Sequence, residues 1–518
     1  MLSKNINILQ IFFLVTFSFF INKYYANFGV EPMDTFVLYN GGYKVLNGLT
    51  PFIDYWLTTG PLMDYFNAFF FFIGGVSWNT YTIHSSLFNV VITVSTYLFL
   101  KNLGLNNFYS TIYSLMFATL MYPVVGTPFV DHHAIIFLLL SFYLFIIGIK
   151  KQKFKFFIYI PSILAIGFLC KQTPTSYGII VIFILGLAAF IFSKNKKDMA
   201  LNTSLGLVIA LLLLFIFFFF SKIPINNFFQ QYIIYGSSIG SYRLRDFNPD
   251  LIGIAHQYKF IFVPLITSAL IFFNSQLKKD LNETLIFISI ISLTLILLFH
   301  QLLTLNENFI FFLIPILTAF NHFYISKYFS KKIIIKYFLI AICVFSVLKY
   351  HERFNEKRKF HTLEFVDLDL AIDASTIDKS LSGLKWITRG YKKNPSFELS
   401  EIKKSISILS KEQDKYMLIT NYLFLSSILK TNDYSPNQWH HPDVSFPIKG
   451  RKDFFIYKKF FTDKLLKNDI SKIYTVGDDL KIYLSLLYKK ECFSKMKLGD
   501  IIYKYEINKD CKDLYEFS

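Results

Sequence analysis

Long apolar runs are the feature that most constrains how this chain can fold. Eleven of them fall in the first two-thirds of the sequence, separated by short polar or charged stretches. A helix needs about 20 residues to cross the hydrocarbon core of a bilayer, and several runs reach that length only with their flanks. The sequence therefore predicts an α-helical polytopic membrane protein with about eleven transmembrane helices. The runs cover residues 6–21, 81–100, 108–122, 134–149, 156–170, 176–192, 200–220, 260–273, 284–299, 309–325 and 333–348.

Charged residues are distributed unevenly along the chain. Residues 1–349 contain 23 Lys and Arg and 11 Asp and Glu, whereas residues 350–518 contain 30 and 24. Only 17% of the whole chain is charged, against about a quarter in a typical soluble protein. We therefore expect a transmembrane domain over residues 1–349 and a small soluble α/β domain over residues 350–518. Helix patterns at 398–410 and 453–467 and strand patterns at 415–420, 470–476 and 501–507 support the second expectation.

Lysine clusters predict which loops face the cytoplasm. Cytoplasmic loops are enriched in Lys and Arg, and four clusters fall on one side only if a twelfth apolar stretch, residues 61–75, does not cross the membrane. We expect that stretch to lie in or on the outer leaflet. The clusters lie within residues 150–155, 194–197, 278–279 and 327–336.

This topology fixes the expected location of each end. Lys4 places the N-terminus inside, and residues 6–21 should stay as the first helix because no small-residue cleavage site follows them. After eleven crossings the C-terminal domain is extracytoplasmic, in a multi-pass protein of the plasma (inner) membrane. Cys492 and Cys511 fall in that domain, where a disulfide is chemically allowed. The basic loops also explain the pI near 9.3, so we expect no nucleic-acid partner.

Two long loops lie on the predicted outer side, residues 23–79 and 222–256. Most carboxylates before residue 350 fall on that side or at its boundary, which indicates a site built on the outer face rather than a central channel. These carboxylates are Glu31, Asp34, Asp54, Asp64, Asp131, Asp246, Asp250 and Glu307.

The first of these loops contains an ordered set of short motifs: MDT at 33–35, GLTPFIDY at 48–55, GPLMDY at 60–65 and FIG at 72–74. This order resembles the first-loop signature of GT-C fold membrane glycosyltransferases, which include the protein O-mannosyltransferase, aminoarabinose transferase and RgtA-like families. VDHHA at 130–134 and KQ at 171–172 extend the resemblance, which covers about residues 5–350. The family pattern has juxtamembrane helices in this loop, in agreement with the interfacial placement of residues 61–75. The chain departs from the pattern in two places: no Glu follows Asp34, and only one proline precedes Leu62.

The resemblance implies transfer of a sugar from a polyprenyl-phosphate donor to a lipid, glycan or protein acceptor on the outer face. A carboxylate would orient or deprotonate the acceptor, and cations would stabilise the leaving phosphate. Asp34 is the expected base, and a single carboxylate acting as base implies inversion at the anomeric carbon. The resemblance identifies no certain cofactor and leaves a divalent metal open; membrane lipids are the remaining partners. The other candidates are Asp131 for catalysis, Lys171, Gln172, Arg243 and Arg245 for the donor phosphate, and Asp54, His132 and Glu307 as further site residues.

Each candidate also has a purely structural interpretation. Asp34 and Asp131 can cap the helices that follow them. His132 fits a polar position at a helix interface, and Lys171 can extend to lipid headgroups. The two arginines can bind headgroups as well.

Two other functions are compatible with a polytopic chain. A transporter or flippase predicts repeated halves and charges within broken spanning helices, and the sequence contains no such repeat. A polysaccharide ligase shares the lipid-linked substrate but would depend on a long late outer loop.

Overall fold

The computed structural model describes residues 8–273, 277, 280–305, 310–329, 333–432, 434–508 and 511. These residues form two compact units, each with its own hydrophobic core. The helical unit contains residues up to Ala26, Thr82–Phe217 and Arg243–Phe360. The sheet unit contains Asn27–Tyr81, Phe218–Tyr242 and the chain from His361 onward.

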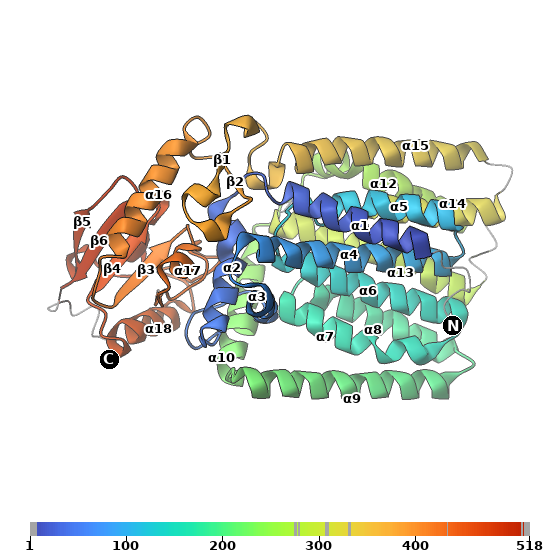
Figure 1. The fold of residues 1–518 in the computed structure, drawn as a ribbon. Helices are drawn as coiled ribbons and strands as arrows, with labels where there is room; N and C mark the ends of the chain where they lie inside the picture. The colour runs from blue at the N-terminus through green and yellow to red at the C-terminus, as the bar shows by residue number, and fades with distance from the viewer. Residues whose placement is uncertain are drawn as a thin grey trace. The chain divides into compact units, whose positions relative to one another are not determined.

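The helical unit consists of apolar helices that run roughly parallel to one another (Figure 1). Hydrocarbon offers no hydrogen-bond partners, so helices that satisfy their own backbone groups suit this environment. Most of the described residues of each predicted apolar run fall in one of these helices, which confirms the predicted fold class. They are α1 (Ile8–Tyr25), α4 (Trp78–Leu103), α5 (Asn107–Leu120), α6 (Val130–Lys151), α7 (Ile160–Cys170), α8 (Thr175–Phe192), α9 (Lys196–Ser221), α12 (Leu251–Phe273), α13 (Leu281–Thr304), α14 (Leu313–Tyr328) and α15 (Ile333–Tyr350).

Within the described residues, eight helices are long and apolar enough to cross a membrane. Three others are shorter: α5 has 14 residues, α7 has 11 and α14 has 16. At 1.5 Å per residue these lengths correspond to about 21, 17 and 24 Å, less than the ~30 Å hydrocarbon core. The chain is a multi-pass membrane protein with eight candidate spans, and the number of eleven crossings stays a prediction.

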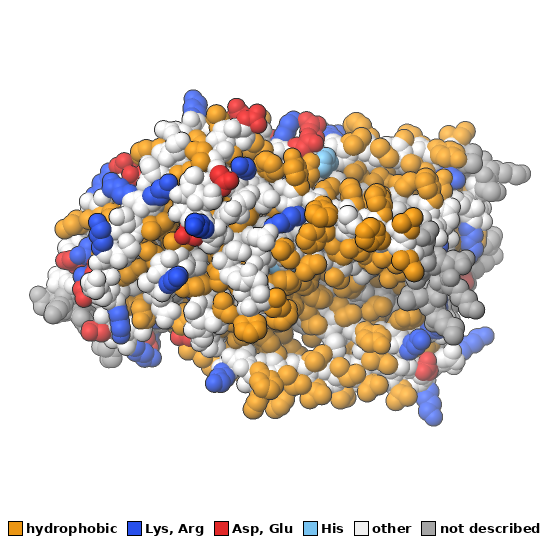
Figure 2. All heavy atoms as spheres, viewed as in Figure 1, with side chains coloured by type: hydrophobic (Ala, Val, Ile, Leu, Met, Phe, Trp, Pro, Cys, Tyr) orange, Lys and Arg blue, Asp and Glu red, His pale blue; other side chains and the backbone are white. Residues whose placement is uncertain are grey.

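Helix α6 lies at the centre of the helical unit. The apolar part of α6 is 83% buried within the protein, whereas that of α9 is 11% buried. Helices α7, α8 and α13 pack against α6, and Figure 2 shows hydrophobic side chains spread over the surface of the surrounding helices. Lipid tails are as apolar as these side chains, so peripheral helices keep them exposed. The polar first turn of α6 is therefore enclosed by protein rather than by lipid.

The ends of three helices meet at one end of this unit. The ammonium of Lys151, at the end of α6, donates to the side chain of Asn102 in the last turn of α4. The amide of Gln152 donates to the side chain of Asn282, at the start of α13, over 3.0 Å. These contacts support the predicted alternation of basic loops for α4, α6 and α13. Five of the lysines used in the topology prediction lie outside the described residues: Lys4, Lys278, Lys279, Lys331 and Lys332.

Cysteine labelling should report this topology directly. In a variant without Cys170 and Cys343, a cysteine placed at the exposed Lys153 should react only after the cells are permeabilised, because its loop belongs to the basic side. A cysteine at the exposed Ser410 should react with a membrane-impermeant reagent in intact cells. Reaction at position 153 and protection at position 410 would show that the topology is inverted.

The sheet unit contains a four-stranded sheet of order β3-β4-β6-β5. Strands β3 (Tyr416–Thr420) and β4 (Lys472–Val476) are parallel, and β6 (Ile502–Ile507) is antiparallel to β4 and to β5 (Phe493–Lys497). Helices α16 (Pro395–Leu409), α17 (Leu425–Leu429) and α18 (Phe454–Lys467) accompany the sheet, and β1 (Ile372–Asp373) pairs with β2 (Lys385–Trp386). The predicted α/β character is thus confirmed. The edge strand β5 was not predicted, because most of its residues are polar and exposed.

Most of each long loop belongs to the sheet unit, whereas the second loop from Arg243 onward belongs to the helical unit. The first carries α2 (Pro32–Leu46) and α3 (Leu62–Gly74), and the second carries α10 (Ile225–Phe228) and most of α11 (Gly236–Arg245). The backbone N–H of Trp56 donates to the carbonyl of Pro436 over 2.6 Å, and the amide of Gln231 donates to the carbonyl of Phe52 over 2.9 Å. Segments that share a core lie on the same side of a membrane, so both loops accompany the C-terminal region. The domain boundary predicted at residue 349 stays a prediction.

Helix α3 has the properties expected of a juxtamembrane helix. Its 13 residues rise about 20 Å, too little to span the hydrocarbon core. One face packs against α2, and the other exposes Phe69, Phe72 and Ile73. An apolar face with no protein cover fits the boundary between headgroups and acyl chains.

Candidate active site

Three helix ends meet at the end of the helical unit that lies away from the Lys151 contacts. They are the first turn of α6, the turn that joins α7 to α8, and the last turn of α13. Each end contributes one charged or titratable side chain: Asp131, Lys171 and His300 respectively.

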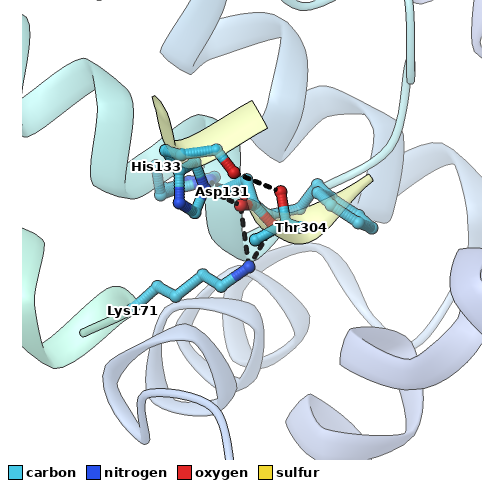
Figure 3. Close-up of polar contacts among 6 residues, drawn as sticks. Asp131, His133, Lys171 and Thr304 are labelled. Carbon is cyan, nitrogen blue, oxygen red and sulfur yellow. Dashed lines mark hydrogen bonds and ion pairs between the residues drawn. The ribbon is translucent and has the colours of Figure 1, made fainter. Parts of the chain in front are cut away.

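Asp131 is the centre of this cluster, with only 1% of its side chain exposed. The ammonium of Lys171 lies 2.7 Å from both carboxylate oxygens (Figure 3). The Nε2 atom of His300 lies 2.7 Å from Oδ1. An ionised carboxylate has only acceptor atoms, so Nε2 carries a proton and donates it in this hydrogen bond. Both oxygens of Asp131 are therefore occupied.

Arg243, near the end of α11, adds a second positive charge to the cluster. Burial lowers the pKa of the Arg243 guanidinium, and the negative charge of Asp131 opposes that shift. The charge of Arg243 also acts on His300. Arg245 is 68% exposed and lies 3.5 Å from its neighbour Asp246. Gln172 follows Lys171 in the turn, and its backbone carbonyl accepts the N–H of Ser176.

Buried side chains hold the first turn of α6 in place. His133 Nε2 lies 3.0 Å from His84 Nε2 in α4, and His133 Nδ1 lies 2.8 Å from the hydroxyl of Tyr122. His132 Nε2 donates to the carbonyl of Met121 over 2.9 Å. These contacts support the interface interpretation of His132. They also fix the orientation of the carboxylate one residue earlier in the chain.

The loop that leads into α6 is held by a buried arginine. Arg358 is fully buried, and its guanidinium donates to the carbonyls of Pro123 and Val125, both over 2.9 Å. The hydroxyl of Ser85 donates to the carbonyl of Gly126 over 2.6 Å. Because these carbonyls are bound, the loop is held in one conformation, and so is the first turn of α6 that follows it.

The capping interpretation of the two catalytic candidates is wrong. Helix α2 has Glu31 at its N-cap, which makes Asp34 the third residue of the helix. Helix α6 has Phe129 at its N-cap, and the Asp131 carboxylate makes no capping hydrogen bond. A negative charge in the first turn still complements the positive end of the helix dipole, so Asp34 stabilises α2 without capping it.

The remaining candidates belong to different units or lie outside the described residues. Asp34 and Asp54 belong to the sheet unit, whereas Asp131 belongs to the helical unit. Asp54 closes its own turn, since its Oδ2 accepts the N–H of Thr50 over 2.7 Å. Glu307 lies outside the described residues. The expectation that Asp34, Asp54, Asp131 and Lys171 converge on one outer cavity stays a prediction.

His300 is the member of the cluster that sequence reasoning missed. It lies just past the apolar run that ends at residue 299, and a histidine at a helix end carries no motif of its own. The predicted topology contained a usable signal, because α13 begins on the basic side and must therefore end on the same side as Asp131.

A second buried carboxylate lies in the sheet unit. Asp64 is 1% exposed, and its Oδ2 accepts from the hydroxyl of Tyr55 (2.8 Å) and the amide of Gln438 (2.7 Å). Burial raises the pKa of Asp64 to about 7, while these hydrogen bonds and the charge of Lys44 oppose the shift. Asp64 thus connects α3 to a residue nearly four hundred positions later in the chain, within the same unit.

The raised pKa of Asp64 predicts a pH dependence of stability. The unfolded chain releases this proton near pH 3.8 and the folded chain near pH 7, so stability falls as the pH rises between these values. One pKa unit corresponds to 1.36 kcal/mol, so the full effect is roughly 4 kcal/mol. Asp64→Asn should keep both hydrogen bonds through its remaining oxygen and lose this slope in unfolding measurements from pH 4 to 8. Tyr55→Phe removes a contact that lowers the pKa of Asp64, so this variant should extend the slope to higher pH. Identical pH profiles for the wild type and Asp64→Asn would contradict the assignment of the slope to Asp64.

Among the described residues, no group of three or more His, Cys, Asp or Glu side chains is arranged to hold a metal ion. The only described disulfide joins Cys492 to Cys511, as the sequence allowed.

Part of this chain matches a known protein family. Residues 58–222 match the family model described as dolichyl-phosphate-mannose-protein mannosyltransferase. The matched segment includes Asp131 and Lys171 and excludes Asp34, Arg243 and His300. This match confirms the predicted resemblance to GT-C-type membrane glycosyltransferases. No curated protein matches the chain by sequence.

Two solved structures show a distant likeness. One is the oligosaccharyltransferase of Archaeoglobus fulgidus in complex with Zn and sulfate, with 9% identity, a TM-score of 0.48 and coverage of 96% of this chain and 73% of that one. The other is the archaeal oligosaccharyltransferase AglB from the same organism, in complex with an inhibitory peptide and a dolichol-phosphate. It has 10% identity, a TM-score of 0.48 and coverage of 96% and 74%.

Proposed function

We propose that this chain transfers a sugar from a polyprenyl-phosphate donor to a lipid, glycan or protein acceptor on the outer face of the membrane, with inversion of the anomeric carbon. The family match supports glycosyltransferase activity. The observation that carries the proposal is the cluster of Lys171, Arg243 and His300 around one buried carboxylate at the end of the helical unit.

The charge of that cluster suits a phosphate. Lys171 and Arg243 contribute two positive charges, and Asp131 contributes one negative charge, so the three side chains carry a net positive charge. Buried charge that is not compensated is costly, and an anionic ligand at this place would compensate it. Cations that face the leaving group also stabilise the charge that develops on the phosphate during transfer.

The hydrogen bonds of Asp131 suggest that Asp131 and Asp34 have different roles in the transfer. Both oxygens of Asp131 already accept from Lys171 and His300, which favours a role in positioning these two groups. Asp34 remains the proposed base. In the proposed step the acceptor oxygen or nitrogen bonds to the anomeric carbon, its proton passes to Asp34, and the bond from that carbon to the phosphate oxygen breaks. The bonding electrons stay on the phosphate oxygen, and polyprenyl phosphate leaves.

The proposed location rests on the topology argument and on the disulfide. Disulfides persist in oxidising, extracytoplasmic compartments, and Cys492–Cys511 lies in the unit that holds most of each long loop. This supports an extracytoplasmic sheet unit.

Donor turnover in nanodiscs tests the proposed function. The purified full chain is incubated with polyprenyl-phosphate mannose, the donor suggested by the family description, and in parallel with other polyprenyl-phosphate sugars. Release of polyprenyl phosphate together with a glycosylated acceptor is the expected result, and the anomeric configuration of the product reports inversion. Transport of the intact lipid-linked sugar across the bilayer without cleavage would favour a flippase instead.

A further inference from the structure

Lysines and aromatic rings gather at the end of the helical unit where Lys151 contacts Asn102. They come from the last turn of α6, the first turn of α13 and the last turns of α14. The Lys150 ammonium lies 4.3 Å from the centre of the Phe323 ring, and the Lys327 ammonium lies 5.8 Å from the same centre. These two distances keep the two ammonium groups within about 10 Å of each other, comparable with the Debye length at physiological salt.

Aromatic side chains hold both lysines against the protein. Lys150 lies 5.6 Å from the centre of the Tyr324 ring, and Lys327 lies 4.7 Å from that of Tyr328. The Tyr324 hydroxyl also donates a hydrogen bond to Glu283. The face of an aromatic ring attracts a cation but does not neutralise its charge. Tyr328 is 42% exposed, as is typical of a tyrosine at the boundary between headgroups and acyl chains.

The positive charge at this end is compensated only in part. The Glu283 carboxylate attracts the Lys150 ammonium, whereas the ammonium groups of Lys151 and Lys327 repel it. The other carboxylate at the start of α13, Asp280, caps that helix through the N–H groups of its first turn. Within the described residues, neither Lys150 nor Lys327 forms an ion pair.

The opposite end of the unit shows how this chain compensates a partly buried cation with its own residues. There the Lys171 ammonium lies 2.7 Å from the carboxylate of Asp131. At the Lys150 end, the sequence that follows α14, residues 329–336, reads FSKKIIIK and adds lysines but no carboxylate. A charge that is partly buried without a counter-ion is costly, so an anion from outside the chain would stabilise this end.

We propose that Lys150, Lys327 and the rings of Phe323, Tyr324 and Tyr328 form a binding site for the phosphate of an anionic membrane lipid. The phosphate oxygens accept from the two ammonium groups, and the glycerol and acyl carbons of the lipid pack on the exposed Tyr328 ring. A zwitterionic lipid fits less well, because its own cation is repelled by the lysines. The predicted topology places the site at the cytoplasmic leaflet, whose anionic lipids attract basic residues. This inference does not depend on the proposed transferase activity.

Two pairs of substitutions test the site. Lys150→Gln with Lys327→Gln removes both cations and keeps most of each side-chain stem. The matched control is Lys153→Gln with Lys155→Gln, which removes the same charge from exposed lysines of the loop that follows α6. Lys155 also lies over an aromatic ring, that of Phe156. The control therefore measures the general attraction of a basic loop for anionic lipid.

Native mass spectrometry of the full chain in detergent measures the binding of added lipid. The wild type should bind phosphatidylglycerol more tightly than phosphatidylcholine. The Lys150 and Lys327 pair of substitutions should lower the affinity for phosphatidylglycerol by about 30-fold, since each basic residue beside an anionic headgroup contributes about fivefold. The control pair should match the wild type. Lys327→Gln alone should lower the affinity by about fivefold, and it tests the site if the double variant fails to fold, because Lys327 is exposed.

Three results would overturn the proposal. Equal affinity for phosphatidylglycerol in the wild type, the double variant and Lys327→Gln would show that these lysines bind no lipid phosphate. An equal loss in the control pair would show attraction to the whole basic surface rather than to a site. Inorganic phosphate added in excess distinguishes the two sources of phosphate: displacement of phosphatidylglycerol would assign the site to a soluble phosphate, and retention of the lipid is the expected result.

Discussion

Asp131→Asn should destabilise the chain by about 3–5 kcal/mol and reduce sugar transfer by at least 10²-fold. The substitution removes the negative charge but keeps the shape, and its amide nitrogen would face the Lys171 ammonium or the His300 N–H, donor against donor. Breaking one side of a buried ion pair leaves the other charge without compensation, and such losses lie in this energy range. Unfolding in detergent or nanodiscs measures the first effect, and donor turnover measures the second.

Lys171→Met supplies the comparison that separates stability from catalysis. If the pair served the fold alone, the double variant Asp131→Asn with Lys171→Met would regain most of the lost stability and most of the activity, because no charge remains unpaired. If Lys171 binds the donor phosphate, the double variant regains stability and stays inactive. Full activity in the double variant would therefore remove Lys171 from the site, and an unaltered stability of Asp131→Asn would show that the pair contributes little to folding.

The helical architecture was predictable because a membrane restricts the available structures so strongly. Most of the described residues of each of the eleven apolar runs are helical, and α3 lies where the lysine distribution required a stretch that does not cross. The number of membrane crossings was harder to predict from the sequence. Helices α5, α7 and α14 are shorter than a full span, and hydropathy does not distinguish a short span from a buried helix.

The grouping of the chain into two units was not predictable from composition. Charge density separates residues before and after 350, but the contacts of Trp56 with Pro436 and of Gln231 with Phe52 link both long loops to the C-terminal region. Such contacts join residues far apart in sequence, and a single sequence carries no local pattern for them. Asp64 and Gln438 meet for the same reason, so their contact was not predicted.

The candidate site was predictable in part. Asp131 and Lys171 are predicted from the family resemblance and from their position at outer helix ends, and the structure joins them directly. The roles of His132 and His300 depend on which neighbours their nitrogens reach, and that follows from helix rotation and packing rather than from residue type.

Asp34→Asn should reduce sugar transfer by about 10²–10⁴-fold while the chain still folds and inserts. Removal of a general base has this effect because the acceptor can no longer pass its proton to a basic group. Asp34 is the third residue of α2, so the lost charge weakens the interaction with the helix dipole by only about 0.3–1 kcal/mol. Protein yield and unfolding temperature should therefore stay near those of the wild type, and the defect should appear in kcat.

Asp54→Asn is the matched control in the same loop. Its remaining oxygen can still accept the N–H of Thr50, so the turn is preserved while a charge is removed. We expect this variant to transfer sugar at nearly the wild-type rate. If Asp34→Asn is fully active with the correct donor, Asp34 is not the base. Loss of transfer in Asp54→Asn alone would then assign proton abstraction to Asp54, and loss in neither variant would return that role to Asp131, whose oxygens would have to exchange Lys171 or His300 for the acceptor.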